Sequence, residues 1–252
     1  MGSRLVNVLR SIYIWTAAAM LTALWVPLLA IVRLFDRDPN HIRTARWFRR
    51  LGRAFTKVYP WRVIVSGLEN IDPNQVYVIV SNHQSFADIP LISCVPLDAK
   101  WLGKIELFRA PIMGWMMRMA GDIPVDRADR RKAAQAWLRC ARTLRNGCSV
   151  LMFPEGTRSR DGELLPFIDG PFQLAIREKV PLLPLLVVGS GRVLAPGSWI
   201  YGASRDVQLR VLEPVSVEGY DAKQSGELRD KVRGRMAAEL RAAEPGMVQS
   251  VI

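Results

Sequence analysis

The chain has 252 residues, half of them hydrophobic, which is enough to bury a substantial core and argues against a disordered protein. Lys and Arg outnumber Asp and Glu by 35 to 23, and the net charge of +12 favours anionic partners: phosphorylated small molecules, acidic lipid surfaces or nucleic acid. The three cysteines, Cys94, Cys140 and Cys148, lack C-x-x-C spacing. We therefore expect small buried thiols in a reducing compartment, with no disulfide framework and no Cys-based zinc site.

The first element in chain order is an uncharged run of 22 residues, 11–32 (SIYIWTAAAMLTALWVPLLAIV). As a helix it would reach roughly 33 Å, which is enough to span a bilayer. Its alanine run lies inside the apolar stretch and not after it, so a cleaved signal peptide fits less well. A buried helix of a soluble protein is the alternative. Pro27 leaves both a full span and a shallow insertion into one leaflet open.

A basic amphipathic helix is predicted over residues 42–58, because apolar residues recur every three or four positions with arginines between them. It could pack on the following domain or lie on anionic headgroups. From Arg33 to Lys57 there are eight basic and two acidic residues, which predicts that the rest of the chain lies on the cytoplasmic side of the cytoplasmic membrane. We thus expect a membrane-associated helical segment over 1–59 and an α/β domain over 60–252.

The rest of the chain predicts alternating strands and helices. Short β-rich runs lie at 61–67, 76–81, 122–125, 149–153, 181–188 and 207–215. Helical periodicity covers 113–120, 129–145, 170–178 and 222–243, and 244–252 reads as a loose tail. The fold class expected is α/β, with a largely parallel or mixed central sheet flanked by helices. In such sheets, binding sites form beyond the carboxyl ends of the strands.

One of the two histidines, His83, follows the apolar strand at 76–81, and Ser85 and Asp88 come next at a helix start. The S-x-x-D spacing is typical of a capping box, and Pro90 would equally suit Asp88 as the N-cap. Such a carboxylate can also accept an imidazole N–H and leave the other ring nitrogen free as a base. The spacing alone does not decide between these roles. With only His41 and His83 available, no metal site is expected.

A second strand, 149–153, runs into the turn Glu155-Gly156-Thr157-Arg158. Gly156 permits close backbone approach, and Arg158 can make forked hydrogen bonds to a phosphate. Arg127 follows another strand, and Lys104 follows the short apolar stretch KWLG. Together these residues predict one base and several cations around one crevice.

On these motifs the chain resembles the glycerolipid acyltransferases of the 1-acyl-sn-glycerol-3-phosphate type. Four blocks match in order: NHQSFAD as the family's N-H-x4-D, KIELFRAPIMGWMMRMAGDIPVDR, FPEGTRS and VPLLPL. The resemblance implies transfer of a fatty acyl group from acyl-CoA or acyl carrier protein to the free hydroxyl of lysophosphatidic acid, without a cofactor. It implies that His83 and Asp88 are catalytic. It also implies that the acceptor is bound by the substrate-binding residues Lys104, Arg127, Glu155, Gly156, Thr157 and Arg158.

One position departs from the family. Ile168 and Asp169 stand where members often carry one or two lysines, which leaves the acceptor headgroup open. Acyltransferases or transacylases for other lysolipids, including ornithine-type lipids, therefore stay as alternatives. A non-catalytic lipid-binding protein would not need His83 and Asp88, and no nucleic-acid-reading motif is present.

Overall fold

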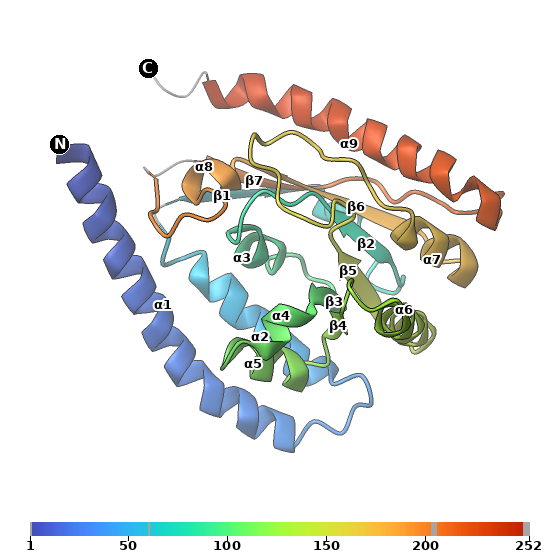
Figure 1. The fold of residues 1–252 in the computed structure, drawn as a ribbon, viewed down its shortest axis with the longest axis horizontal. Coiled ribbons are helices and arrows are strands. Elements are labelled where there is room, and N and C mark those ends of the chain that lie inside the picture. Colours follow the sequence, from blue (N-terminus) through green and yellow to red (C-terminus); the bar gives the residue numbers. More distant parts are fainter. Residues whose placement is uncertain (1, 60, 203–205, 249–252) are drawn as a thin grey trace.

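The computed structural model describes residues 2–59, 61–202 and 206–248. A central sheet is covered by helices on both faces, and one long helix lies along the outside of the domain (Figure 1). The strands are β1 (Arg62–Ser66), β2 (Val78–Ser81), β3 (Ala99–Lys104), β4 (Ile123–Val125), β5 (Ser149–Met152), β6 (Leu182–Val188) and β7 (Asp206–Val211). The α-helices are α1 (Gly2–Leu34), α2 (Ile42–Phe55), α3 (Asp88–Ile92), α4 (Ile105–Arg109), α5 (Met113–Met119), α6 (Arg130–Arg145), α7 (Gly170–Glu178), α8 (Ser190–Val193) and α9 (Ser225–Val248). Short 3-10 helices cover Leu68–Asn70 and Ala222–Gln224.

Within the described residues the sheet has the strand order β1-β7-β6-β2-β5-β3-β4. The strands from β6 to β4 in this order are parallel to their neighbours, whereas β7 is antiparallel to β6 and β1 runs parallel to β7. This confirms the expected α/β class with a mixed, mostly parallel sheet. Because β2, β3, β4 and β5 are parallel, their carboxyl ends meet at one edge of the sheet.

The central strands are apolar throughout because both of their faces are covered. On β2, Val78 and Val80 join the core beneath α6, α7 and α9. The alternate residue Ile79 joins a second core on the other face, which contains Leu91 of α3. A third core joins α1 and α2 to α4 and α5.

The strand prediction missed one element, β3. It is interrupted by polar or small residues at Lys100, Gly103 and Lys104, so it lacks the unbroken apolar pattern of its neighbours. Lys100 is nevertheless only 2% exposed. At the other end of the chain, α9 continues to Val248, so the predicted loose tail is wrong over 244–248, and the rest of it, 249–252, lies outside the described residues.

The long helix α1 contains the predicted apolar run and extends it in both directions. Residues 4–34 are long and apolar enough to cross a membrane, but only 17% of the most apolar window is buried in the protein. Ile14 and Leu29 form a buried stripe, whereas residues such as Met20 and Leu24 are exposed. The helix therefore packs on the domain through one stripe and presents an apolar face outward.

The basic helix α2 packs on the domain more closely than its charge suggests. Phe48 and Leu51 are buried in the core shared with α1 and α5. Arg46 makes two hydrogen bonds to Asp98, at 2.7 and 2.6 Å, and Arg49 pairs with a domain carboxylate, Asp122. Of the two readings left open for this helix, packing on the domain is confirmed for this face.

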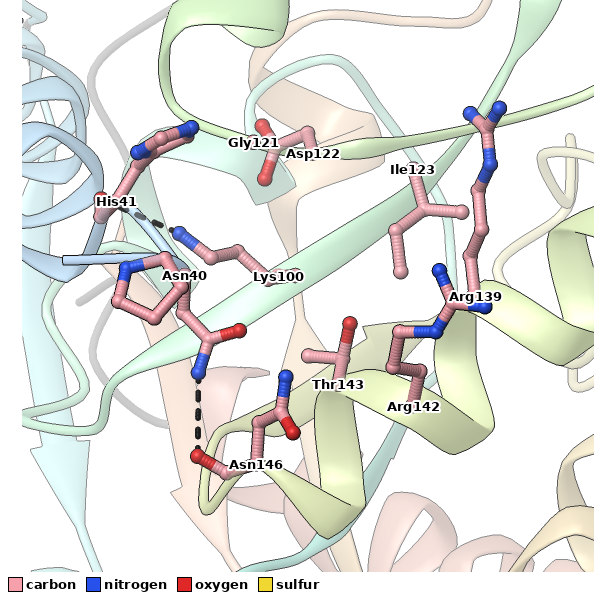
Figure 2. Close-up of a pocket in the computed structure, with 11 residues that line it drawn as sticks. Asn40, His41, Lys100, Gly121, Asp122, Ile123, Arg139, Arg142, Thr143 and Asn146 are labelled. Carbon is pink, nitrogen blue, oxygen red and sulfur yellow. Dashed lines mark hydrogen bonds between the residues drawn. The ribbon is translucent and has the colours of Figure 1, made fainter.

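A cavity of about 290 Å³ lies at the edge of the sheet opposite the carboxyl ends of the strands (Figure 2). It is bounded by the start of β3 and β4, the loop before α2 and the last turns of α6. The residues that line it are Pro39, Asn40, His41, Lys100, Gly121, Asp122, Ile123, Arg139, Arg142, Thr143 and Asn146. None of them belongs to the predicted catalytic site.

Candidate active site

The turn after β2 is held rigidly by the neighbouring strand β6. The side chain of Asn82 donates from Nδ2 to the carbonyl of Val187 (2.8 Å) and accepts the Val187 N–H at Oδ1 (2.7 Å). Asn82 is 2% exposed. This pairing extends the strand contact by one side chain and fixes the position from which His83 leaves the sheet.

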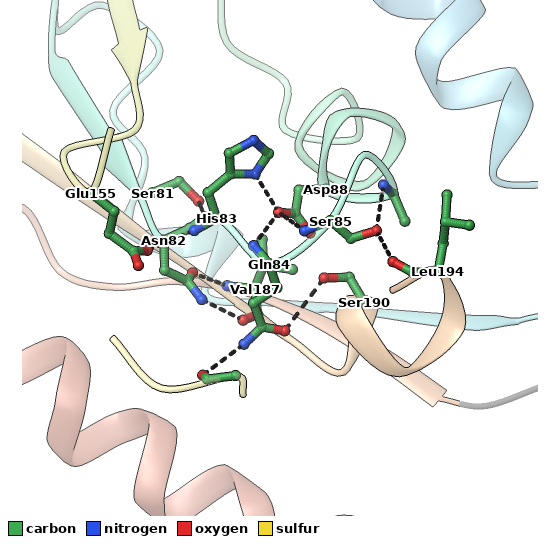
Figure 3. Close-up of polar contacts among 12 residues, drawn as sticks. Ser81, Asn82, His83, Gln84, Ser85, Asp88, Glu155, Val187, Ser190 and Leu194 are labelled. Atoms are coloured by element: carbon green, nitrogen blue, oxygen red, sulfur yellow. Dashed lines mark hydrogen bonds and ion pairs between the residues drawn. The ribbon is translucent and has the colours of Figure 1, made fainter. Parts of the chain in front are cut away.

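The imidazole of His83 pairs with the carboxylate of Asp88 (Figure 3). Nδ1 of His83 lies 2.7 Å from Oδ2 of Asp88, which is fully buried. Since the carboxylate only accepts, Nδ1 carries the proton and Nε2 is left as the basic nitrogen. One ring face of His83 stacks on Phe153, with centroids 4.0 Å apart and planes 17° from parallel. The ring is thus fixed in tautomer and in orientation.

The same oxygen of Asp88 also accepts two backbone N–H groups, from Gln84 at 2.7 Å and from Ser85 at 2.9 Å. The bond from Ser85 is one half of the predicted capping box; the Ser85 hydroxyl instead accepts from Ala87 and donates to the carbonyl of Leu194. The helix begins at Asp88 with Ala87 as its N-cap, so Asp88 is not the N-cap itself. The carboxylate organises the turn and orients His83 at once.

Glu155 connects the two strand ends that carry the site. Its Oε1 accepts the backbone N–H of His83 at 2.8 Å, and its Oε2 accepts that of Leu165 at 3.0 Å. Burial raises the pKa of Glu155 from its ordinary 4.5 to about 7, against the opposing effect of these two N–H donors. Both oxygens are engaged by the backbone, which suits a positioning role for this residue.

The turn after Glu155 brings Arg127 into the site. Nη1 of Arg127 donates to the carbonyl of Gly156. Gly156 has φ +71°, and a Cβ there would lie 2.8 Å from Arg127 Nη1. Glycine is therefore required both by the backbone conformation and by the close approach of the guanidinium.

Three further predicted residues lie at the same edge of the sheet. The guanidinium of Arg158 lies over the ring of Phe86, 4.4 Å from the ring centroid. Phe86 stands three residues after His83 in the chain. Thr157 and Lys104 are exposed, the latter at the carboxyl end of β3. Neither Arg158 nor Lys104 has a carboxylate within ion-pair distance among the described residues, so both cations are available to an anionic group.

The two residues that depart from the family pattern also have defined surroundings. Ile168 is 46% exposed. Asp169 precedes α7, and its Oδ1 lies 2.7 Å from Nη1 of Arg229 on α9. The acid is therefore compensated by an arginine from another helix.

Sequence reasoning missed Asn82 and Phe153 as parts of the site. Asn82 stands directly before His83 at the end of a buried strand, and a polar residue at such a position could have been flagged. Nothing in the sequence pairs Phe153 with His83. The three cysteines are free thiols; Cys140 and Cys148 are buried, whereas Cys94 is half-buried. Burial raises the pKa of Cys140 to about 12 and that of Cys148 to about 11.

With this geometry in view, the comparison with known proteins is decisive. Residues 62–188 match the model of the family described as Acyltransferase, which is half of the chain. The chain belongs to the acyltransferase family. In this acyltransferase the matched part runs from β1 to β6 and contains both strand ends that form the site.

Two similar proteins and one similar solved structure are named as acyltransferases of 1-acyl-sn-glycerol-3-phosphate or 1-acyl-sn-glycerophosphate. A chloroplastic 1-acyl-sn-glycerol-3-phosphate acyltransferase of Brassica napus is 32% identical over 95% of this chain and 68% of its own. A chloroplastic enzyme of the same name from Arabidopsis thaliana is 35% identical, and the match covers 75% of this chain and 54% of the relative. The crystal structure of the 1-acyl-sn-glycerophosphate acyltransferase PlsC from Thermotoga maritima superposes with a TM-score of 0.83 at 26% identity, covering 96% and 98% of the two chains.

Proposed function

We propose that this acyltransferase moves a fatty acyl group from a thioester, acyl-CoA or acyl carrier protein, to the free sn-2 hydroxyl of 1-acyl-glycerol-3-phosphate, giving phosphatidic acid. The reaction is that of a 1-acylglycerol-3-phosphate O-acyltransferase in phospholipid synthesis. The names of the relatives support it, and the match to the Thermotoga maritima enzyme covers 98% of that enzyme's chain. The single observation in this chain that carries the chemistry is the His83–Asp88 pair at the end of β2.

In the proposed mechanism His83 is the general base. Its Nε2 takes the proton from the acceptor hydroxyl while the oxygen attacks the thioester carbonyl carbon. The buried carboxylate of Asp88 stabilises the imidazolium that forms, because opposite charges attract strongly in a site shielded from water. The tetrahedral intermediate collapses by breaking the C–S bond, and the imidazolium returns its proton to the thiolate. No covalent acyl-enzyme is required.

Acceptor binding is assigned to the cations at the same edge. Arg158, Arg127 and Lys104 would hold the phosphate so that the neighbouring hydroxyl meets Nε2 of His83. Arg127 and Arg158 are tied to the His83 turn through Gly156 and Phe86 respectively. The backbone of Gly156 and Thr157 would complete the turn that borders the phosphate, and Glu155 would hold this turn against His83.

We infer a membrane-surface role for residues 1–59. Trp15 Nε1 donates to the carbonyl of Trp199 at 2.8 Å, and Trp25 Nε1 donates to that of Trp47 at 2.9 Å. A helix of 33 residues is about 50 Å long, and these two tryptophans tie the middle of α1 to the loop after α8 and to α2. It therefore lies along the domain and places its outward apolar face in one leaflet. The basic residues of this segment favour the cytoplasmic side of the cytoplasmic membrane.

A panel of acceptors and donors with product analysis tests the proposed function. Full-length protein is assayed with acyl-CoA and with acyl carrier protein thioesters against 1-acyl-glycerol-3-phosphate, lysophospholipids with larger headgroups and an ornithine-type lysolipid. Phosphatidic acid should be the main product, and its rate of formation should fall by about 10² to 10⁴ with His83→Ala. Preferential acylation of an acceptor without a phosphomonoester would replace the proposed substrate with the alternative that Ile168 and Asp169 leave open.

A further inference from the structure

The cavity at the amino-terminal edge of the sheet gathers cations that the acyl transfer does not use. Lys100 and His41 lie on one side of it, and Arg139 and Arg142 of α6 lie on the other (Figure 2). Lys100 stands near the start of β3, whereas the proposed acceptor residue Lys104 stands at its end. The two groups of cations therefore lie at opposite edges of the sheet.

Lys100 is a buried ammonium group without a carboxylate partner. It is 2% exposed, and its Nζ donates to the carbonyls of Ala120 at 2.7 Å and His41 at 3.3 Å. Among the described residues no Asp or Glu lies within ion-pair distance of it, and its two hydrogen-bond partners are neutral carbonyl groups. Burying such a charge is costly unless something anionic approaches it.

The arginines on the opposite wall are also unpaired. Arg139 and Arg142 are exposed and stand three residues apart on α6, which makes them neighbours on the helix surface. Neither has a hydrogen-bond or ion-pair partner for its side chain among the described residues. The negative end of the helix dipole accounts for a basic residue in the last turn. It does not account for a buried lysine across the cavity or for the buried Nδ1 of His41, which lacks a partner in the described structure.

Among the described residues that line the cavity, Asp122 is the one carboxylate, and its charge is paired with Arg49. Its Oδ1 accepts from Arg49 and from the backbone N–H of Trp101 at 3.0 Å, whereas its buried Oδ2 has no partner among the described residues. Next to it, Gly121 has φ +73°, a backbone conformation that favours glycine, and it borders Lys100 on this wall of the cavity.

We propose that this cavity binds a phosphate group through Lys100, Arg139 and Arg142. Its volume of about 290 Å³ is at the lower end of the ~300–1,000 Å³ of small-molecule sites, which suits a headgroup and not a whole lipid. Leu34 and Phe35, at the end of α1, are 80% and 69% exposed and precede the lining loop by a few residues. A lipid in contact with α1 is therefore one source of the phosphate, and a soluble phosphate is the other.

Binding would link the membrane segment to the α/β domain. The cavity wall comes from the loop between α1 and α2, from β3 and from α6, so a bound phosphate would bridge all three. A ligand that binds only the folded state stabilises it. The inference does not depend on the acyl-transfer activity and can be measured without it.

The test uses the intact protein in neutral detergent micelles, with the thermal midpoint as readout. One arm adds inorganic phosphate at constant ionic strength. The other adds dihexadecyl phosphate to the micelles, because this lipid has no hydroxyl to acylate. Arg139→Ala/Arg142→Ala is compared with Lys223→Ala/Arg241→Ala, which removes two exposed positive charges elsewhere, and with Arg158→Ala, which removes the acceptor cation.

The wild type and the charge-matched variant should show the same rise in midpoint. Arg158→Ala loses only the phosphate held at the acceptor site, so it should keep the part of the rise that depends on Arg139 and Arg142. The cavity variant should need at least roughly tenfold more ligand, since it loses two charge-assisted donors. A rise with inorganic phosphate identifies a soluble source, and a rise with the lipid alone identifies a headgroup. No rise in either arm, or an unchanged rise in the cavity variant, would overturn the proposal. Arg139→Ala alone serves if the double variant is too unstable to titrate.

Discussion

The backbone N–H of His83 donates to the carboxylate of Glu155, with 2.8 Å between nitrogen and Oε1. His83 follows β2 and Glu155 follows the adjacent parallel strand β5, so one buried side chain joins two strand ends. The other carboxylate oxygen accepts the N–H of Leu165. The proposed base is thus held at its backbone by Glu155 and at its ring by Asp88.

Replacing the proposed base should stop the chemistry and leave the fold. In His83→Ala, kcat should fall by about 10² to 10⁴ because proton removal from the hydroxyl is no longer assisted. Initial rates with 1-acyl-glycerol-3-phosphate and an acyl thioester measure this. Thermal midpoint and vesicle binding should stay near those of the wild type. Turnover close to the wild-type rate would show that His83 is not the general base.

Asp88→Asn removes the negative charge of this side chain but keeps an oxygen that can accept its hydrogen bonds. The carboxamide oxygen can still accept N–H groups, but it offers no negative charge to the imidazolium, so kcat should fall while the acceptor KM changes little. Asp206→Asn is the matched control, because Asp206 pairs with Arg62 at the far edge of the sheet. A kcat equal to that of the control would show that the Asp88 charge is not used.

The raised pKa of Glu155 predicts that the free energy of unfolding depends on pH. Its pKa is raised from 4.5 in the unfolded chain to about 7 in the folded protein, so folding favours the protonated form. The stabilisation is fully present below pH 4.5 and is lost as the pH rises to about 7. The stability of the wild type relative to Glu155→Gln should therefore fall by up to about 3 kcal/mol across this window. Denaturant unfolding of both proteins from pH 4.5 to 8 measures it; parallel curves would contradict the prediction.

Arg158→Ala should weaken acceptor binding. Loss of a charge-assisted bond to phosphate is worth about 1.5 to 3 kcal/mol, so the acceptor KM should rise by roughly tenfold or more with kcat nearly unchanged. Arg160→Ala provides a control two residues away. If kcat fell and KM did not, Arg158 would stabilise charge in the transition state and would not position the acceptor.

The outward face of α1 should carry the membrane attachment. Leu24 is 72% exposed, and Leu24→Glu should weaken binding to vesicles by about tenfold or more, since burying a leucine contributes about 1.5 to 3 kcal/mol. Leu138→Glu changes another exposed leucine (61%), on α6, and should leave vesicle binding unchanged. Equal loss in both variants would mean that added negative charge, and not the α1 face, is responsible.

The amino-acid pattern alone predicted most elements of the fold. Apolar runs at Val78–Val80 and Leu182–Val188 are continuous because both faces of these strands are buried, and such runs are visible without any partner. The four motif blocks predicted the family, which the comparison confirms. The residues of the site stay predictions until their variants are measured.

Tertiary structure alone decided which distant groups meet. Lys100 interrupts the apolar pattern of β3, so the sequence did not predict this strand. In the structure its Nζ donates to the carbonyls of Ala120 and His41. The sequence left open whether α2 packs on the domain or lies on anionic headgroups, and the structure shows Arg46 hydrogen-bonded to Asp98 of the domain. The pattern of apolar and polar residues along the sequence indicates which residues are buried. The partner of a buried polar group depends on packing between segments far apart in the chain, which no short stretch of sequence contains.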